Sequence, residues 1–204
     1  MKRLYERYLL PHLIDRSCSL GQVMKTRSQI IPLARGRVLE IGIGTGLNLA
    51  FYDAAHVTAI VGVDPAAHMH SLAHRRALGI GIPVQTIGLE LGEIRAPAQS
   101  FDSVVCTFTL CTIPDAIAAM REMRRVLKPE GKLLFAEHGL APDAAVARWQ
   151  HRLTPMWKPF AGGCHLNRDI PALISAGGFD IRELHTGYLG GPRPMTWVYR
   201  GWAS

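Results

Sequence analysis

Long apolar runs, clustered cysteines and long basic runs are all missing from this 204-residue chain. No segment approaches the roughly 18 consecutive apolar residues that a membrane span needs. Residues 1–8 are basic at first but lack the apolar core of a secretory signal. We therefore expect a cytoplasmic protein without an integral membrane segment.

The few cysteines are Cys18, Cys106, Cys111 and Cys164, which form no C-x-x-C pair and show no zinc spacing. Two of them fall in a stretch that we expect to be a buried strand region, which favours free thiols. A disulfide framework is therefore not expected, and we predict no metal site.

Basic residues outnumber acidic ones, 23 to 16, which gives a formal charge of +7. They are scattered in short clusters such as 75–76 and 124–125, with no aromatic-interleaved patch. We therefore expect no nucleic-acid partner. With 48% hydrophobic residues, the chain can bury a substantial core. We predict one domain over residues 1–204, with a helical N-terminal region at 1–34 and a core at 35–204.

What the chain does contain is an apolar run, within residues 38–48, that breaks into three alternating glycines. Because Gly42, Gly44 and Gly46 lack a Cβ atom, the loop can turn sharply and approach a ligand closely. The helix expected after them would point free N–H groups at a carboxylate. Asp64 ends the next expected strand, where its carboxylate can accept two hydrogen bonds from a ribose diol. This arrangement suits an adenosine-containing cofactor.

The glycine spacing argues against two other nucleotide sites. A dinucleotide site reads G-x-G-x-x-G, but Leu47 stands at its last position, and the Lys-Ser/Thr ending of a P-loop is absent. Glu40, two residues before the first glycine, would repel a pyrophosphate and suits an ammonium group. The E-x-G-x-G-x-G pattern with a downstream acid resembles the first two motifs of the class I S-adenosylmethionine (SAM) methyltransferases. That resemblance implies SAM as cofactor and S-adenosylhomocysteine as product.

Strand and helix patterns alternate along the chain, which indicates a parallel sheet. The expected strands are 37–41, 58–63, 83–87, 100–108 and 132–137, followed by a pair at 179–186 and 195–200. Helices are expected from the glycine loop to about residue 52, and at 66–78, 116–127 and 143–152, with a turn at 128–131. The S-F-D-x-V-V and L-K-P-x-G-K segments extend the methyltransferase resemblance over residues 36–137. It implies a Rossmann-like α/β fold with helices on both faces of a seven-stranded, mostly parallel sheet of order 3-2-1-4-5-7-6.

The first 20 residues form an amphipathic segment, with Leu4, Tyr8 and Leu9 near helical spacing before Pro11 interrupts. Three interpretations stay open: a lid over the active site, a peripheral contact with a membrane surface, or a helix packed on the core. The short apolar face weighs against the membrane. A second helix is expected at 22–33.

In an open α/β sheet the ligand lies beyond the carboxyl ends of the strands. The candidate cofactor-binding residues are therefore Glu40, Gly42, Gly44, Gly46, Asp64, Pro65, Glu90, Leu91 and Thr107. After the third strand, the related enzymes usually carry a Gly-Asp-Ala type loop that holds the adenine, but Leu89 stands where Asp is common. Adenine recognition is accordingly assigned to Glu90 or to backbone amides.

Two histidines are candidate catalytic residues. A base is needed only when the acceptor carries a proton that must leave. His138, at the end of the fifth strand, is the first candidate, and His165, in a loop of small residues, is the second. A structural histidine that caps the strand is the alternative for His138. The remaining clustered histidines have the spacing of a helix surface, not of a metal site; they are His68, His70 and His74.

A narrower resemblance concerns the acceptor. The segments 105–111, 137–139, 148–150, 155–158 and 162–166 resemble the methyltransferase-like 7 group, whose members methylate small thiols. This implies a thiol or hydrosulfide as the small-molecule acceptor. The group's eukaryotic members carry a hydrophobic N-terminal anchor, which a polar amphipathic segment replaces here, so membrane attachment does not carry over. A phospholipid amine, a quinone or another small metabolite stays open as acceptor, as does a non-catalytic SAM-binding sensor or partner subunit. The oligomeric state stays open too.

Overall fold

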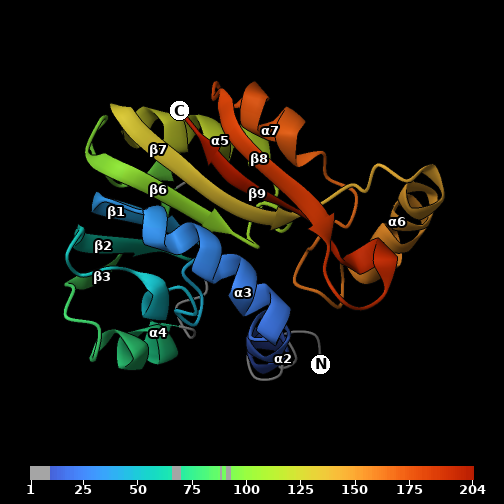
Figure 1. Cartoon of the computed structure of the whole chain (residues 1–204), viewed down its shortest axis with the longest axis horizontal. Helices are drawn as coiled ribbons and strands as arrows, with labels where there is room; N and C mark the ends of the chain where they lie inside the picture. The colour runs from blue at the N-terminus through green and yellow to red at the C-terminus, as the bar shows by residue number, and fades with distance from the viewer. Residues whose placement is uncertain (1–9, 66–69, 88, 91–92) are drawn as a thin grey trace.

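The computed structural model describes residues 10–65, 70–87, 89–90 and 93–204 (Figure 1). Its largest sheet has the strand order β3-β2-β1-β6-β7-β9-β8. The bounds are β1 Gly36–Ile41, β2 Val57–Val63, β3 Val84–Ile87, β6 Phe101–Thr107, β7 Leu127–His138, β8 Ile181–Tyr188 and β9 Trp197–Ala203. Counted in chain order, these seven strands give 3-2-1-4-5-7-6, as predicted. The labels differ because β4 (Leu89–Glu90) and β5 (Glu93–Ile94) pair separately, which was not predicted.

The first five strands of this sheet are parallel, and β9 runs antiparallel to both of its neighbours. The last four residues of β1 and the last five of β6 are buried without alternation. Strands covered on both faces need apolar side chains in both directions, which explains these continuous runs. The largest core cluster fills the sheet around Val104, Phe135 and Phe179.

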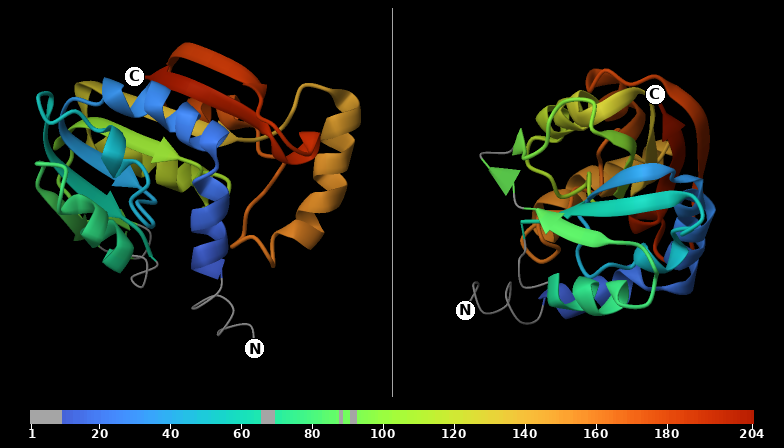
Figure 2. Two further views of the ribbon diagram at one scale, coloured as in Figure 1. Left: turned by 60° about the horizontal axis from the view of Figure 1, so that its bottom comes forward. Right: turned by 90° about the vertical axis from the view of Figure 1, so that its left-hand side faces the viewer.

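The helices lie on both faces of the sheet. They are α2 Leu10–Cys18, α3 Gly21–Ile30, α4 His70–Ala77, α5 Ala116–Val126, α6 Ala144–Trp157 and α7 Ile170–Ala176. Figure 1 shows α3 across the front of the sheet, with α5 and α7 behind it. In that view and in the left panel of Figure 2, α6 lies at the opposite end of the molecule from β3. Across the described ranges, every helix is too short or too polar to traverse a bilayer.

The prediction of an α-helix directly after the glycine loop was wrong. Only a 3₁₀ turn, Leu49–Phe51, forms there, and Tyr52 already has an extended backbone. The amides of Leu49 and Phe51 bond three residues back, to Gly46 and Asn48, so no α-helical ladder starts. The side chains of Asn48 and Tyr52 are instead turned toward Glu40.

Other boundaries also differ from the expectations. Strand β7 begins at Leu127, although its register shows Phe101 opposite Leu127 and Ser103 opposite Lys132, so residues 128–131 bulge out of the pairing. Helix α2 begins at Leu10 with Pro11 in its first turn, and Leu4, Tyr8 and Leu9 lie outside the described residues, so the interruption expected at Pro11 stays a prediction. Helix α6 extends to Trp157. Helix α7 was missed; its start is fixed by Asp169, whose carboxylate accepts the Ala172 N–H at 3.0 Å.

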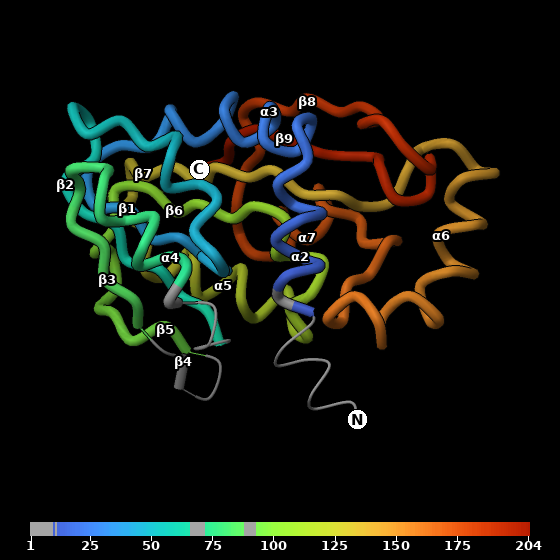
Figure 3. Tube along the Cα trace, turned by 90° about the horizontal axis from the view of Figure 1, so that it is seen from below, coloured from blue at the N-terminus to red at the C-terminus, as the bar shows by residue number. Residues whose placement is uncertain are grey.

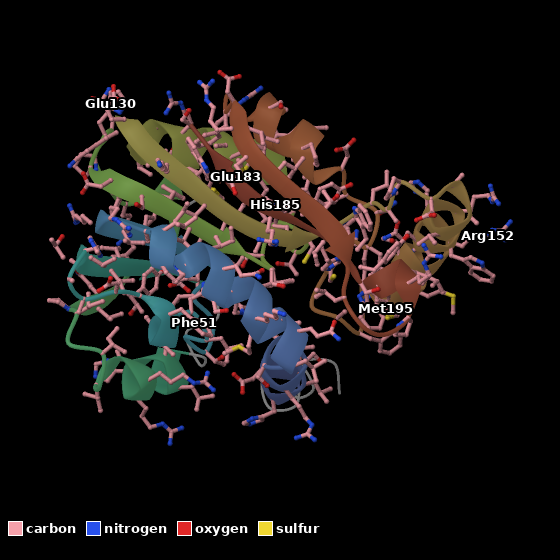
Figure 4. The ribbon with its side chains drawn as sticks, in the orientation of Figure 1. Phe51, Glu130, Arg152, Glu183, His185 and Met195 are labelled. Atoms are coloured by element: carbon pink, nitrogen blue, oxygen red, sulfur yellow. The ribbon has the colours of Figure 1, made fainter. Side chains whose placement is uncertain are left out.

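The outer strand β8 carries charged side chains along its exposed face. Figure 4 labels Glu183 and His185 on this strand, and the His185 Nε2 lies 2.7 Å from the Glu183 Oε1. Charged side chains on an edge strand discourage pairing with another chain.

Gly201 in β9 provides a test of this packing. A Cβ atom there would lie 1.9 Å from the backbone oxygen of Glu183, whereas a Cβ atom at Gly187 in β8 would meet nothing within 4 Å. We expect Gly201→Ala to lower the free energy of unfolding by about 1–3 kcal/mol, because backbone must move. Gly187→Ala is the matched control and should stay within about 0.5 kcal/mol of wild type. Urea unfolding measures both; equal effects would contradict the observed β8–β9 contact.

Candidate functional site

A cavity of about 930 Å³ lies at the carboxyl ends of β1, β2 and β6. Its walls are the glycine loop, the end of β2, the loop after β6, part of α5, helix α2 and Gly162. Small-molecule sites usually measure about 300–1,000 Å³, so this one has room for a cofactor and a small acceptor together.

Some of the predicted cofactor-binding residues line this cavity and others do not. Those that line it are Glu40, Gly42, Gly44, Asp64, Pro65 and Thr107. Gly46 does not line it. Glu90 belongs to β4, but its side chain and Leu91 lie outside the described residues, as does His68. On the side of β5, the cavity is lined by Glu93 and Ile94 instead.

The three glycines all adopt the left-handed backbone conformation, with φ of +70°, +51° and +81° at Gly42, Gly44 and Gly46. A Cβ atom at Gly42 would lie 2.3 Å from the Thr109 Oγ1, and one at Gly46 would lie 3.0 Å from the Ala73 Cα. The chain's own backbone and packing therefore require glycine at both positions, in addition to any approach of a ligand.

Asp64 braces the glycine loop. Its Oδ2 accepts the Gly44 N–H at 2.9 Å, which joins the end of β2 to the turn that follows β1. The residue is partly exposed and lines the cavity. A carboxylate in this position can hold the loop and still present an oxygen lone pair to a ligand hydroxyl.

Glu40 is buried, and both of its oxygens are hydrogen-bonded. Asn48 Nδ2 donates to Oε1 at 2.9 Å and the Tyr52 hydroxyl donates to Oε2 at 2.8 Å. Burial raises the pKa of Glu40 to about 7, although the two hydrogen bonds and the Arg27 charge oppose the shift. Near neutral pH this carboxyl group is therefore poised between its two protonation states.

Arg27 of α3 is a buried cation in the cavity wall. Its Nη1 donates to Asn48 Oδ1 at 2.7 Å and to Thr107 Oγ1 at 2.6 Å, and its guanidinium carbon lies 5.0 Å from the centre of the Phe108 ring. Among the described residues no carboxylate forms an ion pair with it, and burial lowers its pKa. Arg27 was not predicted, because nothing near it in the sequence marks a partner 80 positions away.

Glu137 stabilises the loop after β6 through hydrogen bonds to its backbone. This buried carboxylate accepts the N–H groups of Thr109 at 2.8 Å and Leu110 at 3.0 Å. Burial raises its pKa even though these bonds favour the charged form. Phe108, just before them, has a φ of +52°, a strained conformation for a residue with a side chain. The bonds to Glu137 are what stabilise this turn in the cavity wall.

Helix α2 forms another wall of the cavity through Leu10, Ile14, Asp15 and Cys18. Asp15 accepts a short hydrogen bond from the Thr45 hydroxyl and pairs with Arg76 at 3.0 Å. A Cβ atom added at Gly162 would lie 3.5 Å from the Ile14 side chain, so the helix also approaches the loop after α6. Figure 3 shows α2 crossing the middle of the molecule, with β4 and β5 on one side and α6 on the other.

The candidate base His138 lies outside the cavity lining, in a cluster with two cysteines. Its Nε2 is 3.0 Å from the Cys164 sulfur, and its Nδ1 is buried. Hydrogen bonds from Cys111 and from His138 outweigh burial and lower the pKa of Cys164 to about 4. The hydrogen bond to Cys164 raises the pKa of Cys111. Burial alone would lower the pKa of His138, but its interactions with the Cys164 sulfur outweigh burial and raise that pKa.

His165 does not line the cavity either. Its Nδ1 lies 3.0 Å from the Cys111 carbonyl oxygen, to which its backbone N–H also donates at 2.8 Å. The role of base for either histidine stays a prediction.

All four cysteines have free thiols. The convergence of Cys111, His138 and Cys164 was missed because each comes from a different segment, with no short spacing to reveal it.

Known methyltransferases are similar in sequence to a large part of this chain. A family profile described as a methyltransferase domain matches residues 12–184. Human thiol S-methyltransferase TMT1B is 37% identical over 174 residues, which cover 81% of this chain and 68% of that protein. The rat protein of the same name is 33% identical over 167 residues, covering 79% and 65%. Phosphatidylethanolamine N-methyltransferase from Cereibacter sphaeroides is 32% identical over 127 residues, covering 58% and 62%. The matches thus span about two thirds of these relatives' lengths.

Solved structures share the fold. A SAM-dependent methyltransferase from Leishmania major superposes with a TM-score of 0.72 at 14% identity, covering 100% of this chain and 81% of that one. One from Aquifex aeolicus superposes with a TM-score of 0.65 at 16% identity, covering 95% and 97%. At such identities the likeness concerns the fold alone.

The raised pKa of Glu40 predicts a pH-dependent stability. The folded protein binds the proton of the Glu40 carboxyl group more tightly than the unfolded chain does. The contribution of this proton to the free energy of unfolding is therefore full below a pH of about 4.5 and is lost as the pH rises through 7. Glu40→Gln removes the titration. In urea unfolding without ligand, the variant should therefore gain on wild type by about 2–3 kcal/mol between pH 5 and pH 7.5. The exposed Glu130→Gln is the control. A pH-independent difference for Glu40→Gln would contradict the shift.

Proposed function

We propose that this chain, which belongs to the methyltransferase domain family, transfers a methyl group from SAM to a small thiol or hydrosulfide. The observation that carries the proposal is the cavity at the strand ends, where an acid-flanked glycine loop meets a buried arginine. The names of the human and rat relatives support a thiol as acceptor. S-adenosylhomocysteine would be the second product.

The residues in the cavity wall fit SAM. Glu40, hydrogen-bonded only to neutral side chains, suits an ammonium group, and a cation beside it would favour its ionised form. Asp64 suits a ribose diol, and the glycine loop leaves its backbone open to a ligand. Bound there, SAM would supply an electrophilic methyl group with a neutral leaving group.

The chain's own contribution is alignment and exclusion of water, because such a displacement needs few catalytic residues. Apolar side chains of α2 and the loop after β6 line the cavity and would flank the reacting atoms. Arg27 places a buried positive charge in the wall, where it would favour an acceptor that arrives as a thiolate. We also propose that α2 acts as a lid over the cavity. We propose that the protein is cytoplasmic.

An amine acceptor is the second candidate, supported by the match to the Cereibacter sphaeroides phosphatidylethanolamine N-methyltransferase. An amine must attack as a neutral base, which a buried cation in the wall would favour over its ammonium form. Release of S-adenosylhomocysteine should therefore be measured with amines as well as with thiols. Non-catalytic SAM binding would be recognised there by cofactor affinity without release of S-adenosylhomocysteine.

Asp64→Ala tests the cofactor site. Loss of charge-assisted hydrogen bonds to the ribose, worth about 1.5–3 kcal/mol, should weaken SAM binding roughly ten- to a hundredfold. Titration calorimetry on the folded variant measures the affinity. Asp64→Asn keeps an oxygen for the Gly44 N–H but loses the charge, so it separates damage to the loop from loss of the ligand contact. Wild-type affinity in Asp64→Ala would remove this residue from the site.

The acceptor is tested by release of S-adenosylhomocysteine with hydrosulfide, short alkyl thiols, amines and phenols. A free thiol with a pKa near 8.5 is only a few per cent thiolate at neutral pH. If His138 takes the thiol proton, His138→Ala should reduce the rate most near pH 7 and little near pH 9.5, with His165→Ala as comparison. Turnover of an amine or phenol without thiol turnover would overturn the thiol assignment. A pH-independent defect in His138→Ala would remove the base role alone.

A further inference from the structure

The cluster of Cys111, His138 and Cys164 lies outside the cavity lining, and the function proposed above uses neither of its cysteines. One ligand-type atom from each residue, two sulfurs and one imidazole nitrogen, lies within 4.8 Å of the other two. Cys111 and Cys164 are 3% and 8% exposed, so both sulfurs are buried, whereas His138 is partly buried. Among the described residues it is the one group of three that meets the geometry of a metal site.

We propose that these three residues form a zinc-binding site. Two cysteines and one histidine, with a water in the fourth position, are a donor set that zinc uses in proteins, with Zn–S bonds near 2.3 Å and Zn–N bonds near 2.0 Å. A tetrahedral ion with such bonds holds its sulfurs about 3.8 Å apart and a sulfur and nitrogen about 3.5 Å apart. The His138 Nε2 and the Cys164 sulfur are 3.0 Å apart, a hydrogen-bond distance, so they would separate by about 0.5 Å to admit the ion.

The donors are held in place by three separate segments. His138 is the last residue of β7 and pairs with Val198 of β9. The Cys111 carbonyl accepts the His165 N–H at 2.8 Å, which joins the loop after β6 to the loop after α6. Gly162 and Gly163, with φ of +61° and +87°, turn the chain so that Cys164 comes next to the other two. Because the backbone already positions each donor, zinc would need only small side-chain movements.

The surroundings suit a soft ion shielded from water. Leu166 belongs to the same buried cluster, and Leu153, Trp157, Ala161 and Met195 pack against it. Figure 4 labels Met195, whose thioether belongs to this apolar shell, beside α6. The indole N–H of Trp157 is buried without a hydrogen-bond partner among the described residues. Sulfur donors in a dry pocket select zinc over magnesium or calcium.

A disulfide between Cys111 and Cys164 is the competing explanation. A disulfide would join the two sulfurs, but it would not account for the His138 Nε2 at 3.0 Å from the Cys164 sulfur. Zinc uses all three groups. The site also bears on catalysis, because an Nε2 bound to zinc has no lone pair left to accept a proton from a thiol. Zinc binding and the base role of His138 therefore exclude each other.

The test is zinc content and its effect on stability, neither of which depends on methyl transfer. Full-length protein purified under reducing conditions is loaded with zinc, freed of excess metal by gel filtration, and analysed by plasma mass spectrometry. We expect one zinc per chain, a rise in melting temperature on zinc addition, and thiolate-to-cobalt charge-transfer absorption after exchange for Co²⁺. Cys111→Ser and Cys164→Ser should each weaken binding at least tenfold and lose the stabilisation, whereas Cys106→Ala should keep both.

Several outcomes would overturn the zinc site. They are substoichiometric zinc in the reduced wild type, zinc binding that survives Cys164→Ser, or equal loss of zinc in Cys106→Ala. A Cys111–Cys164 disulfide found by non-reducing peptide mapping, with no zinc taken up after reduction, would support the competing explanation. Failure of zinc binding beside normal thiol turnover would leave the proposed function intact, and the converse result would leave the zinc site intact.

Discussion

The arrangement around the cavity depends on a buried positive charge. Placing the Arg27 guanidinium away from water is costly unless its donors are used. Nη1 donates to Asn48 and Thr107, and the ring of Phe108 covers the guanidinium, whereas Nε has no hydrogen-bond partner among the described residues. These partners come from the glycine loop and the end of β6. Asn48 in turn bonds to Glu40, so one cation on α3 orients the acid at the end of β1. Disturbing any member leaves the others with unsatisfied polar atoms.

Two buried acids of the same residue type have different tasks, which only the structure separates. Glu137 accepts backbone N–H groups that would otherwise be unpaired in the turn after β6, so its role is to hold that turn. Glu40 accepts bonds from the side chains of Asn48 and Tyr52 and lies in the cavity wall. Backbone donors cannot leave without unfolding the turn, whereas side-chain donors can rotate. Glu40 is therefore the acid whose environment a ligand can change.

Much of the fold could be predicted because its signals are local. The apolar runs that end at Ile41, Val63 and Thr107 are strands, and the glycines after the first run mark a left-handed turn. The helix after that turn was predicted wrongly because Asn48 and Tyr52 are recruited by Glu40, a tertiary contact that propensity does not reveal. Arg27 and the Cys111, His138 and Cys164 cluster were missed for the same reason. Their partners lie tens of residues away and leave no periodic trace.

The position of β7 in the sheet has a consequence for the order of assembly. Its one edge pairs with β6, which precedes it in the chain, and its other edge pairs with β9, about sixty residues later. During synthesis the parallel strands can therefore assemble while residues 133–138 still expose unpaired backbone groups along one side. Such an edge is a template for pairing with another nascent chain. Until β9 has emerged and paired, this edge of β7 is therefore open to pairing with another chain.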